Sequence, residues 1–182
     1  MKRISAGTIA KLGLLTAIAV ALGYVEYLFP LTSIPGIKLG LANTVLLYAL
    51  YLMDAGSALL LMLLKMGLSG LLFGGATAMI YSFAGGALSL AAMLLARRIK
   101  GISEVGVSVT GALLHNAGQL AVAMFAVESR ALLAYAPVLL VSAAVTGTLT
   151  GLVAKGCIRA LEKANKRGGK TDDNAAQGEE KP

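Results

Sequence analysis

The amino-acid sequence predicts an all-α, polytopic membrane protein with six transmembrane helices. Of its 182 residues, 57% are hydrophobic, which exceeds the roughly 45–50% of ordinary globular domains. The excess lies in long continuous blocks, as in membrane helices, and not in the short alternating strands of an outer-membrane barrel. The positive charge between these blocks is distributed unevenly, and this second observation predicts how the helices are oriented.

Thirteen of the sixteen Lys and Arg residues fall on one side of the predicted bundle. The other side carries only Lys38 and Arg130, and Lys65 lies inside a span. Because cytoplasmic loops retain positive charge, this asymmetry predicts a multi-pass protein of the cytoplasmic membrane, with both termini in the cytoplasm. The residues on the predicted cytoplasmic side are Lys2, Arg3, Lys11, Arg97, Arg98, Lys100, Lys155, Arg159, Lys163, Lys166, Arg167, Lys170 and Lys181.

The first three predicted helices are separated by residues that break helices or form turns. The first is too long for a signal peptide and lacks a small-residue cleavage site, so we interpret it as a retained helix. The second and third are shorter than the about 20 residues that a membrane crossing needs. These spans are Thr8–Phe29, Leu39–Met53 and Ser57–Phe73, separated by Pro30, Pro35 and Gly36 and by the turn Asp54-Ala55-Gly56.

The last three predicted helices are bounded by basic residues or by a change in composition. Beyond Leu161 the chain is polar and cannot bury enough apolar surface to offset the entropy of ordering. We therefore expect a membrane domain over residues 1–160 and a polar cytoplasmic tail over residues 161–182, disordered from Lys166 to Pro182. The remaining spans are Ala76–Ala96, which follows Gly74-Gly75 and stops at Arg97-Arg98, then Val105–Val127 and Leu132–Cys157.

Small residues at four-residue spacing mark helix faces that can approach another helix closely. For most of these positions the sequence favours packing inside the bundle, as for Ala143, Gly147 and Gly151. On the first helix, Gly13, Ala17 and Ala21 have the same spacing and could instead dock a partner protein. Spacing alone leaves both alternatives open.

Polar side chains inside the predicted spans are the candidates for function. An ionisable group at the bilayer centre costs about 2.5–3.5 kcal/mol on insertion scales, so it usually faces a cavity and has a partner. These groups occupy the middle and outer half of the spans, whereas the inner half is apolar. This pattern predicts a pocket for a small-molecule ligand that opens to the outside. The candidate binding residues are Glu26, Lys38, Asn43, Lys65, His115, Asn116 and Gln119.

Each candidate has a functional and a structural interpretation. We expect Lys38 and Lys65 to attract an anionic group, and Glu26 to act as a counter-ion. Alternatively, Lys65 pairs with Glu26 for structural reasons, and the loop around Lys38 is an ordinary turn. We expect the amides and imidazole of the fifth helix to orient the ligand by hydrogen bonds; the alternative for His115 is a hydrogen-bonded core histidine. One histidine and one cysteine, Cys157, cannot form a metal site of the usual ligand spacing, so no metal is expected.

Two polar motifs resemble the family described as heptaprenyl diphosphate synthase component I, also called the Gx transporter family. The resemblance covers about Ala10–Ala160. More loosely, the short spans and the strip containing Ala17 and Ala21 resemble the substrate-binding S components of energy-coupling-factor (ECF) transporters. That resemblance implies an S-component-like bundle whose first helix docks a transmembrane coupling subunit driven by two ATPases. The matching motifs are Pro35-Gly36-Ile37-Lys38-Leu39-Gly40-Leu41-Ala42-Asn43 and Leu114-His115-Asn116-Ala117-Gly118-Gln119-Leu120, with Leu72-Phe73-Gly74 and Tyr81-Ser82-Phe83-Ala84-Gly85-Gly86 in support.

The family name suggests prenyl transfer, but the sequence argues against catalysis. Prenyl diphosphate condensation requires magnesium held by clustered carboxylates, and the acidic pair Asp172-Asp173 lies in the tail predicted to be disordered. There is no Walker A phosphate loop, so an ATP-driven role needs a partner. The net charge of +7 lies in loops and tail without a basic–aromatic platform, which argues against nucleic acid. We expect no enzyme activity and no cofactor.

Three functions remain open from the sequence. The first is a substrate-binding subunit of an importer for a vitamin or quinone-related precursor. The alternative is a non-catalytic membrane component associated with heptaprenyl diphosphate or isoprenoid-quinone synthesis, in which a diphosphate would meet Arg97, Arg98 and Lys100. The third is a stand-alone facilitator or structural membrane protein, which the lack of inverted repeats disfavours relative to the first.

Overall fold

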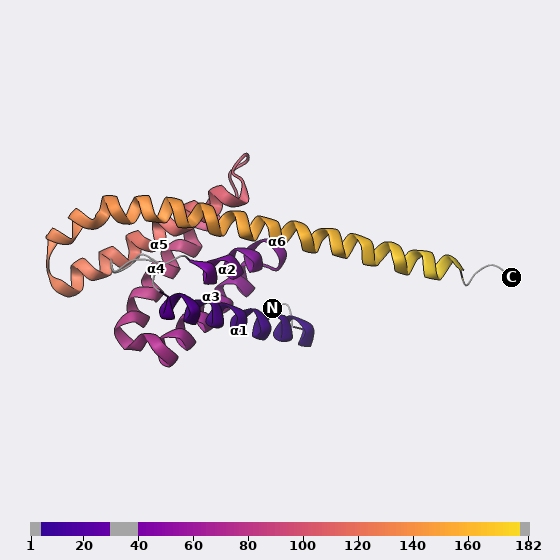
Figure 1. Ribbon diagram of the computed structural model, residues 1–182, viewed down its shortest axis with the longest axis horizontal. Helices are drawn as coiled ribbons and strands as arrows, with labels where there is room; N and C mark the ends of the chain where they lie inside the picture. The colour runs from indigo at the N-terminus through magenta and orange to yellow at the C-terminus, as the bar shows by residue number, and fades with distance from the viewer. Residues whose placement is uncertain (1–4, 30–39, 179–182) are drawn as a thin grey trace.

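The computed structural model describes residues 5–29 and 40–178, with side chains described up to residue 164. All regular elements in these ranges are helical, and Figure 1 shows their arrangement. Lys38 and most of the predicted outer loop lie outside the described residues. The elements are α1 (Ala6–Leu28), α2 (Leu41–Leu52), α3 (Ala55–Ser69), the π-helical segment η1 (Gly70–Gly74), α4 (Gly75–Ala96), α5 (Glu104–Val127), the 3-10 segment η2 (Arg130–Tyr135) and α6 (Ala136–Gly178).

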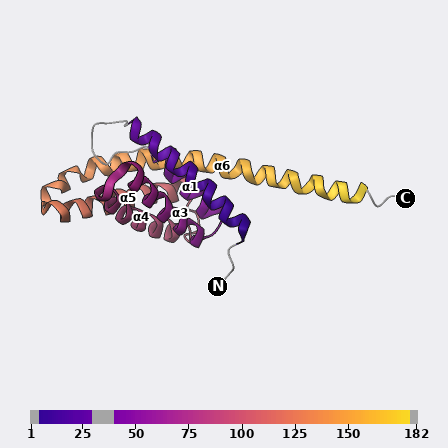
Figure 2. The ribbon, with the colours of Figure 1, turned by 90° about the horizontal axis from the view of Figure 1, so that it is seen from below.

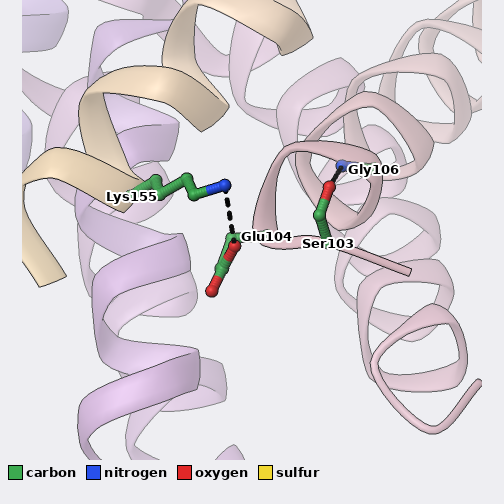
Figure 3. Close-up of polar contacts among 4 residues, drawn as sticks. All are labelled: Ser103, Glu104, Gly106 and Lys155. Atoms are coloured by element: carbon green, nitrogen blue, oxygen red, sulfur yellow. Dashed lines mark hydrogen bonds and ion pairs between the residues drawn. The ribbon is translucent and has the colours of Figure 1, made fainter. Parts of the chain in front are cut away.

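Polar side chains cap the first turns of α1, α3 and α5. Ser5 accepts a hydrogen bond from the backbone N–H of Thr8, and Asp54 accepts one from that of Ser57 at 2.9 Å. Figure 3 shows the same arrangement at α5, where the Oγ atom of Ser103 accepts from the N–H of Gly106 at 3.3 Å. These caps satisfy N–H groups that the first turn of a helix leaves without partners.

Successive helices from α3 to α6 pack in antiparallel pairs, with glycines where they cross. A Cβ atom added at Gly86 of α4 would collide with the side chain of Met66 on α3. A Cβ atom added at Gly118 of α5 would lie 2.9 Å from the Cα atom of Gly85 on α4. The predicted strip on the last helix also packs inside the bundle, since a Cβ atom at Gly147 would lie 2.8 Å from the Cα atom of Val109.

One end of the bundle carries most of the described positive charge, and we call it the basic end. It contains the start of α1, the α2–α3 turn and the α4–α5 turn. An ion pair joins α5 to α6 there, with 3.8 Å between Glu104 Oε2 and Lys155 Nζ (Figure 3). The cations at this end are Lys11, Arg97, Arg98, Lys100 and Lys155.

The apolar core lies in the half of the bundle next to the basic end. Its largest fully buried side chains come from α2, α3 and α5, and the methionines of α3 and α4 fill the gaps beside the crossing glycines. Methionine suits this position because its flexible side chain adapts to irregular spaces. This packing closes the bundle on that side. The fully buried residues are Leu46, Leu47, Leu50, Leu61 and Val107.

A charged side chain at the end of the neighbouring helix α4 holds the C-terminal end of the short helix α2. There, Nη1 of Arg97 donates a hydrogen bond to the carbonyl oxygen of Leu50. The Arg97 guanidinium also lies 5.0 Å from the centroid of the Tyr51 ring. A cation at a helix C-terminus complements the helix dipole, so Arg97 fixes α2 to the end of α4.

The outer surface of the bundle is strongly apolar. Large hydrophobic side chains such as Leu71, Phe125 and Val141 are 78%, 87% and 66% exposed. An exposed apolar surface of this extent is what a lipid environment requires. The protein is therefore a helical membrane protein. Four described segments are long and apolar enough to span a bilayer, and the helix α2 is shorter. The four are Ala6–Leu28, Ala55–Ala96, Glu104–Val127 and Arg130–Ala164. The second of them contains α3, η1 and α4.

One predicted boundary needs correction, and another agrees with the structure. The predicted third span ends at Phe73, and helical structure continues from α3 through the π-helical η1 to Gly74, after which the chain reverses into α4 near Gly75, whose φ is 75°. The predicted sixth span begins at Leu132, but the structure has the 3-10 turn η2 there, and α6 starts at Ala136. This deviation occurs at a hairpin turn, where side-chain pattern carries little information about backbone hydrogen bonding.

The last helix extends along the polar tail. α6 continues to Gly178, and Figures 1 and 2 show it projecting beyond the bundle; the disorder expected from Lys166 to Pro182 stays a prediction. A helix satisfies its backbone hydrogen bonds internally, and Ala, Lys, Glu and Gln all favour this conformation. The division of the chain into a membrane domain and a cytoplasmic tail at residue 160 stays a prediction.

Candidate functional site

A polar cavity of about 120 Å³ lies in the half of the bundle away from the basic end. All six α-helices contribute residues to its wall. This volume has room for several water molecules or for the polar part of a small ligand. Six of the seven predicted binding residues line it, and the seventh, Lys38, lies outside the described residues. The six are Glu26, Asn43, Lys65, His115, Asn116 and Gln119.

Lys65 and Asn43 connect α3 to α2 across the cavity. The Nζ atom of Lys65 donates a hydrogen bond to Oδ1 of Asn43 at 2.7 Å, and both side chains are half-buried. The amide oxygen is neutral, so this bond orients the ammonium group without cancelling its charge. The contact joins a residue from the middle of α3 to one from the first turn of α2.

Glu26 stabilises the start of α2 from the neighbouring helix α1. Its Oε1 atom accepts a hydrogen bond from the backbone N–H of Leu41, the first residue of α2. The preceding residue, Gly40, adopts a φ of 77° and has no side chain to cap the helix. A carboxylate at a helix N-terminus also complements the helix dipole. The structure thus gives Glu26 a capping function, and its predicted role as counter-ion of a ligand stays a prediction.

The polar cluster of α5 faces the cavity, as its spacing predicts. His115 and Gln119 are one helical turn apart and both line the wall. Asn116 is partly used in packing, because its Nδ2 atom donates to the carbonyl oxygen of Leu139 on α6 at 3.0 Å. Its Oδ1 atom and second N–H remain as further hydrogen-bonding capacity. Close approach of α4 at this level depends on Gly85, where a Cβ atom would lie 2.7 Å from the carbonyl oxygen of His115.

Sequence reasoning missed the hydroxyl groups and the aromatic wall of the cavity. Ser69 and Phe73 follow Lys65 at intervals of four residues, so they continue the same face of α3 into η1. That spacing was a usable signal, but serine and phenylalanine are common in membrane spans and do not stand out as ionisable and amide side chains do. The other lining hydroxyl groups belong to Ser82, Thr146 and Thr150.

An aromatic cluster surrounds the Phe73 side of the cavity. The Phe73 ring centroid lies 5.5 Å from that of Tyr24 and 5.5 Å from that of Tyr27, both on α1. These tilted contacts have the geometry that aromatic pairs prefer. The Phe73 ring is therefore held by two neighbouring rings and forms a fixed part of the wall.

Within the described residues, no group of three or more His, Cys, Asp or Glu side chains could hold a metal ion. The cavity instead offers one ammonium, one carboxylate, one imidazole, amides and hydroxyl groups. Such a set can bind a small polar molecule through hydrogen bonds and charge. That it does so stays a prediction.

Comparison with known proteins identifies the family of the chain. The family model for heptaprenyl diphosphate synthase component I matches residues 15–157, which include all the residues that line the described cavity. No curated protein and no solved structure matches the chain. Since the match covers well over half of the chain, the protein belongs to the heptaprenyl diphosphate synthase component I family.

Proposed function

We propose that this chain is the integral membrane, substrate-binding subunit of a small-molecule importer and resembles an ECF S component. The observation that carries the proposal is a polar cavity lined from all six helices in a bundle whose other half is a closed apolar core. A polar chamber in a lipid-facing bundle is costly unless it holds a ligand or water. The sequence contains no Walker A phosphate loop, and ATP-driven uptake would therefore use separate coupling and ATPase subunits.

The charge distribution supports an outward-facing cavity. We place the basic end in the cytoplasm because Lys and Arg are retained on that side of the membrane. With six crossings and both termini inside, the cavity then lies in the outer half of the bilayer and the apolar core seals it from the cytoplasm. This orientation suits capture of a molecule from outside the cell. A vitamin or a quinone-related precursor is the expected ligand.

The first helix offers a surface for the coupling subunit. Gly13, Ala17 and Ala21 are exposed, and no atom outside the helix α1 lies within 4 Å of a Cβ added at Gly13. The opposite face of α1 packs into the bundle through Leu12 and Ala19, which are 4% and 0% exposed. The small-residue strip is thus not used for packing within the described chain, which favours the docking alternative over the internal one.

A substitution on this strip should separate docking from stability. We expect Ala17→Leu to reduce co-purification of a coupling subunit by about tenfold, equivalent to about 1.4 kcal/mol of binding free energy, because the larger side chain prevents close approach. The thermal stability of the isolated chain should not change. Ala87→Leu, at an exposed position on α4, serves as the matched control. Equal co-purification of both variants would exclude the strip as the docking surface.

Native mass spectrometry of the gently purified protein tests the proposed function. An importer subunit should retain a small molecule, a coupling subunit or both, and the spectrum reports them together. Lys65→Met should lower the occupancy of the small molecule, since its ammonium group lines the cavity. A chain that carries no small molecule, binds nothing from a broad metabolite panel and brings down no membrane partner would contradict the proposal.

The family name favours a second candidate function. It implies that the chain accompanies another component in heptaprenyl diphosphate synthesis, as a non-catalytic membrane partner of a soluble synthase. In this case a diphosphate would bind near Arg98 and Lys100 at the basic end, since Arg97 already contacts α2. A pull-down that recovers a soluble prenyl diphosphate synthase would support this function, and crosslinking of a prenyl diphosphate in the cavity would exclude this version of it.

A further inference from the structure

Three side chains on one helix face make the two ends of the cavity wall chemically different. Lys65, Ser69 and Phe73 follow one another at four-residue intervals along α3 and η1, and all three line the wall. The interval from Lys65 to Phe73 corresponds to roughly 10–12 Å along a helix axis. One end of this track is therefore cationic, the middle carries a hydroxyl group, and the other end is an aromatic ring.

The electrostatic balance of the cavity favours an anion over a cation. Lys65 and Glu26 are the two described lining residues with a full charge at neutral pH, and these charges cancel formally. The N-terminus of α2 also lies at the cavity, and it carries about half a positive charge from the helix dipole. Glu26 is hydrogen-bonded to that N-terminus through Leu41. The carboxylate of Glu26 is thus engaged by α2, whereas the Lys65 ammonium group donates to a neutral amide oxygen, and this arrangement favours an anionic ligand over a cationic one.

The aromatic end of the track is prearranged for a flat apolar group. Phe73 contacts Tyr24 and Tyr27 on its flank, so two neighbouring rings support its orientation. The chain has only four Phe, six Tyr and no Trp, and three of these rings gather at this one place. An aromatic wall favours ligands with a ring or another planar apolar surface, through offset or tilted stacking.

We propose that the cavity selects small molecules in which an anionic group is joined to a flat apolar ring, of which an aromatic carboxylate is the simplest member. The anion lies at Lys65, and the ring lies against Phe73. The amides and hydroxyl groups contributed by α5 and α6 bind polar substituents between the two ends. This assignment of a ligand class rests on the import function proposed above and narrows it.

Protection of an introduced cysteine tests the ligand class even though the natural ligand is unidentified. In a Cys157→Ser background, Ser82→Cys places a single thiol in the cavity wall. Its labelling by the uncharged reagent N-ethylmaleimide is measured in the presence of benzoate, acetate or benzylamine. We expect the half-protecting concentration of benzoate to be about fivefold lower than that of either control, since acetate lacks the ring and benzylamine reverses the charge. Ser69→Cys repeats the measurement if the first variant does not fold.

Three variants assign the selectivity to two residues, Lys65 and Phe73. Lys65→Met should remove the advantage of benzoate over benzylamine, whereas Lys65→Arg should keep it. Phe73→Leu should remove the advantage of benzoate over acetate. Equal protection by all three compounds, or no protection of a thiol that reacts from outside the cell, would overturn the ligand class and leave the import function standing. A thiol that cannot be reached from outside would overturn both.

Discussion

Alanine at Gly118 should lower the free energy of unfolding of the bundle by about 1–2 kcal/mol. The added methyl group would lie 2.9 Å from the Cα atom of Gly85 and 3.0 Å from the carbonyl oxygen of Ala84. These are backbone atoms, so the clash cannot be relieved by rotating a side chain. Overpacking of this kind costs typically about 1–3 kcal/mol, which exceeds the about 1 kcal/mol by which alanine favours a helix over glycine.

A glycine on the open side of α3 provides the matched control. No atom outside its own helix lies within 4 Å of a Cβ added at Gly67, so Gly67→Ala should be neutral or stabilising by up to about 1 kcal/mol. Reversible unfolding of both variants in mixed detergent micelles measures the difference. If the two substitutions have the same effect, the α4–α5 crossing is not as close as the structure has it.

Alanine at Arg97 should be the second strongly destabilising substitution, by about 1–2 kcal/mol. The change removes a charged hydrogen bond to the Leu50 carbonyl oxygen and the contact with the Tyr51 ring. Hydrogen bonds to charged groups contribute about 1.5–3 kcal/mol, and an exposed cation–π contact contributes about 0.5–1 kcal/mol. Because Arg97 itself is exposed, solvent reduces the sum to the stated range.

The neighbouring arginine is the control for charge alone. Arg98→Ala removes the same formal charge from the same turn, and Arg98 is also exposed. Its unfolding free energy should stay within about 0.5 kcal/mol of the wild type, as is usual for surface substitutions. Equal losses from both variants would show that total charge at this end, and not the anchoring of α2, governs stability.

The helices and most of the cavity residues were predictable because both follow from short sequence patterns. A polar side chain in an apolar span must face a cavity or a partner, and this rule placed Lys65 and Asn43 correctly on the wall. The four-residue interval between His115 and Gln119 likewise predicted that they share a face, and both line the cavity.

The remaining features depend on contacts that no local pattern encodes. The capping of α2 by Glu26 joins a side chain to a backbone N–H fifteen residues away. A sequence does not show which side chain will bind a particular backbone N–H group. Phe73 reads as one more apolar residue in a span, so its place beside Tyr24 and Tyr27 could not be inferred. The contact between Glu26 and α2 meets the need of this helix for a cap, since Gly40 has no capping side chain, and the counter-ion role of Glu26 stays a prediction beside it.

Vectorial labelling of a single cysteine tests whether the cavity opens to the outside of the cell. The Ser82→Cys, Cys157→Ser variant is treated with a membrane-impermeant thiol reagent in intact cells and in inverted membrane vesicles. The native Cys157, which is exposed and lies on α6 between Lys155 and Arg159, reports the opposite side in the wild-type chain. We expect the thiol introduced at position 82 to react in intact cells, and Cys157 to react only in inverted vesicles. Labelling of the introduced thiol only in inverted vesicles would contradict an outward opening.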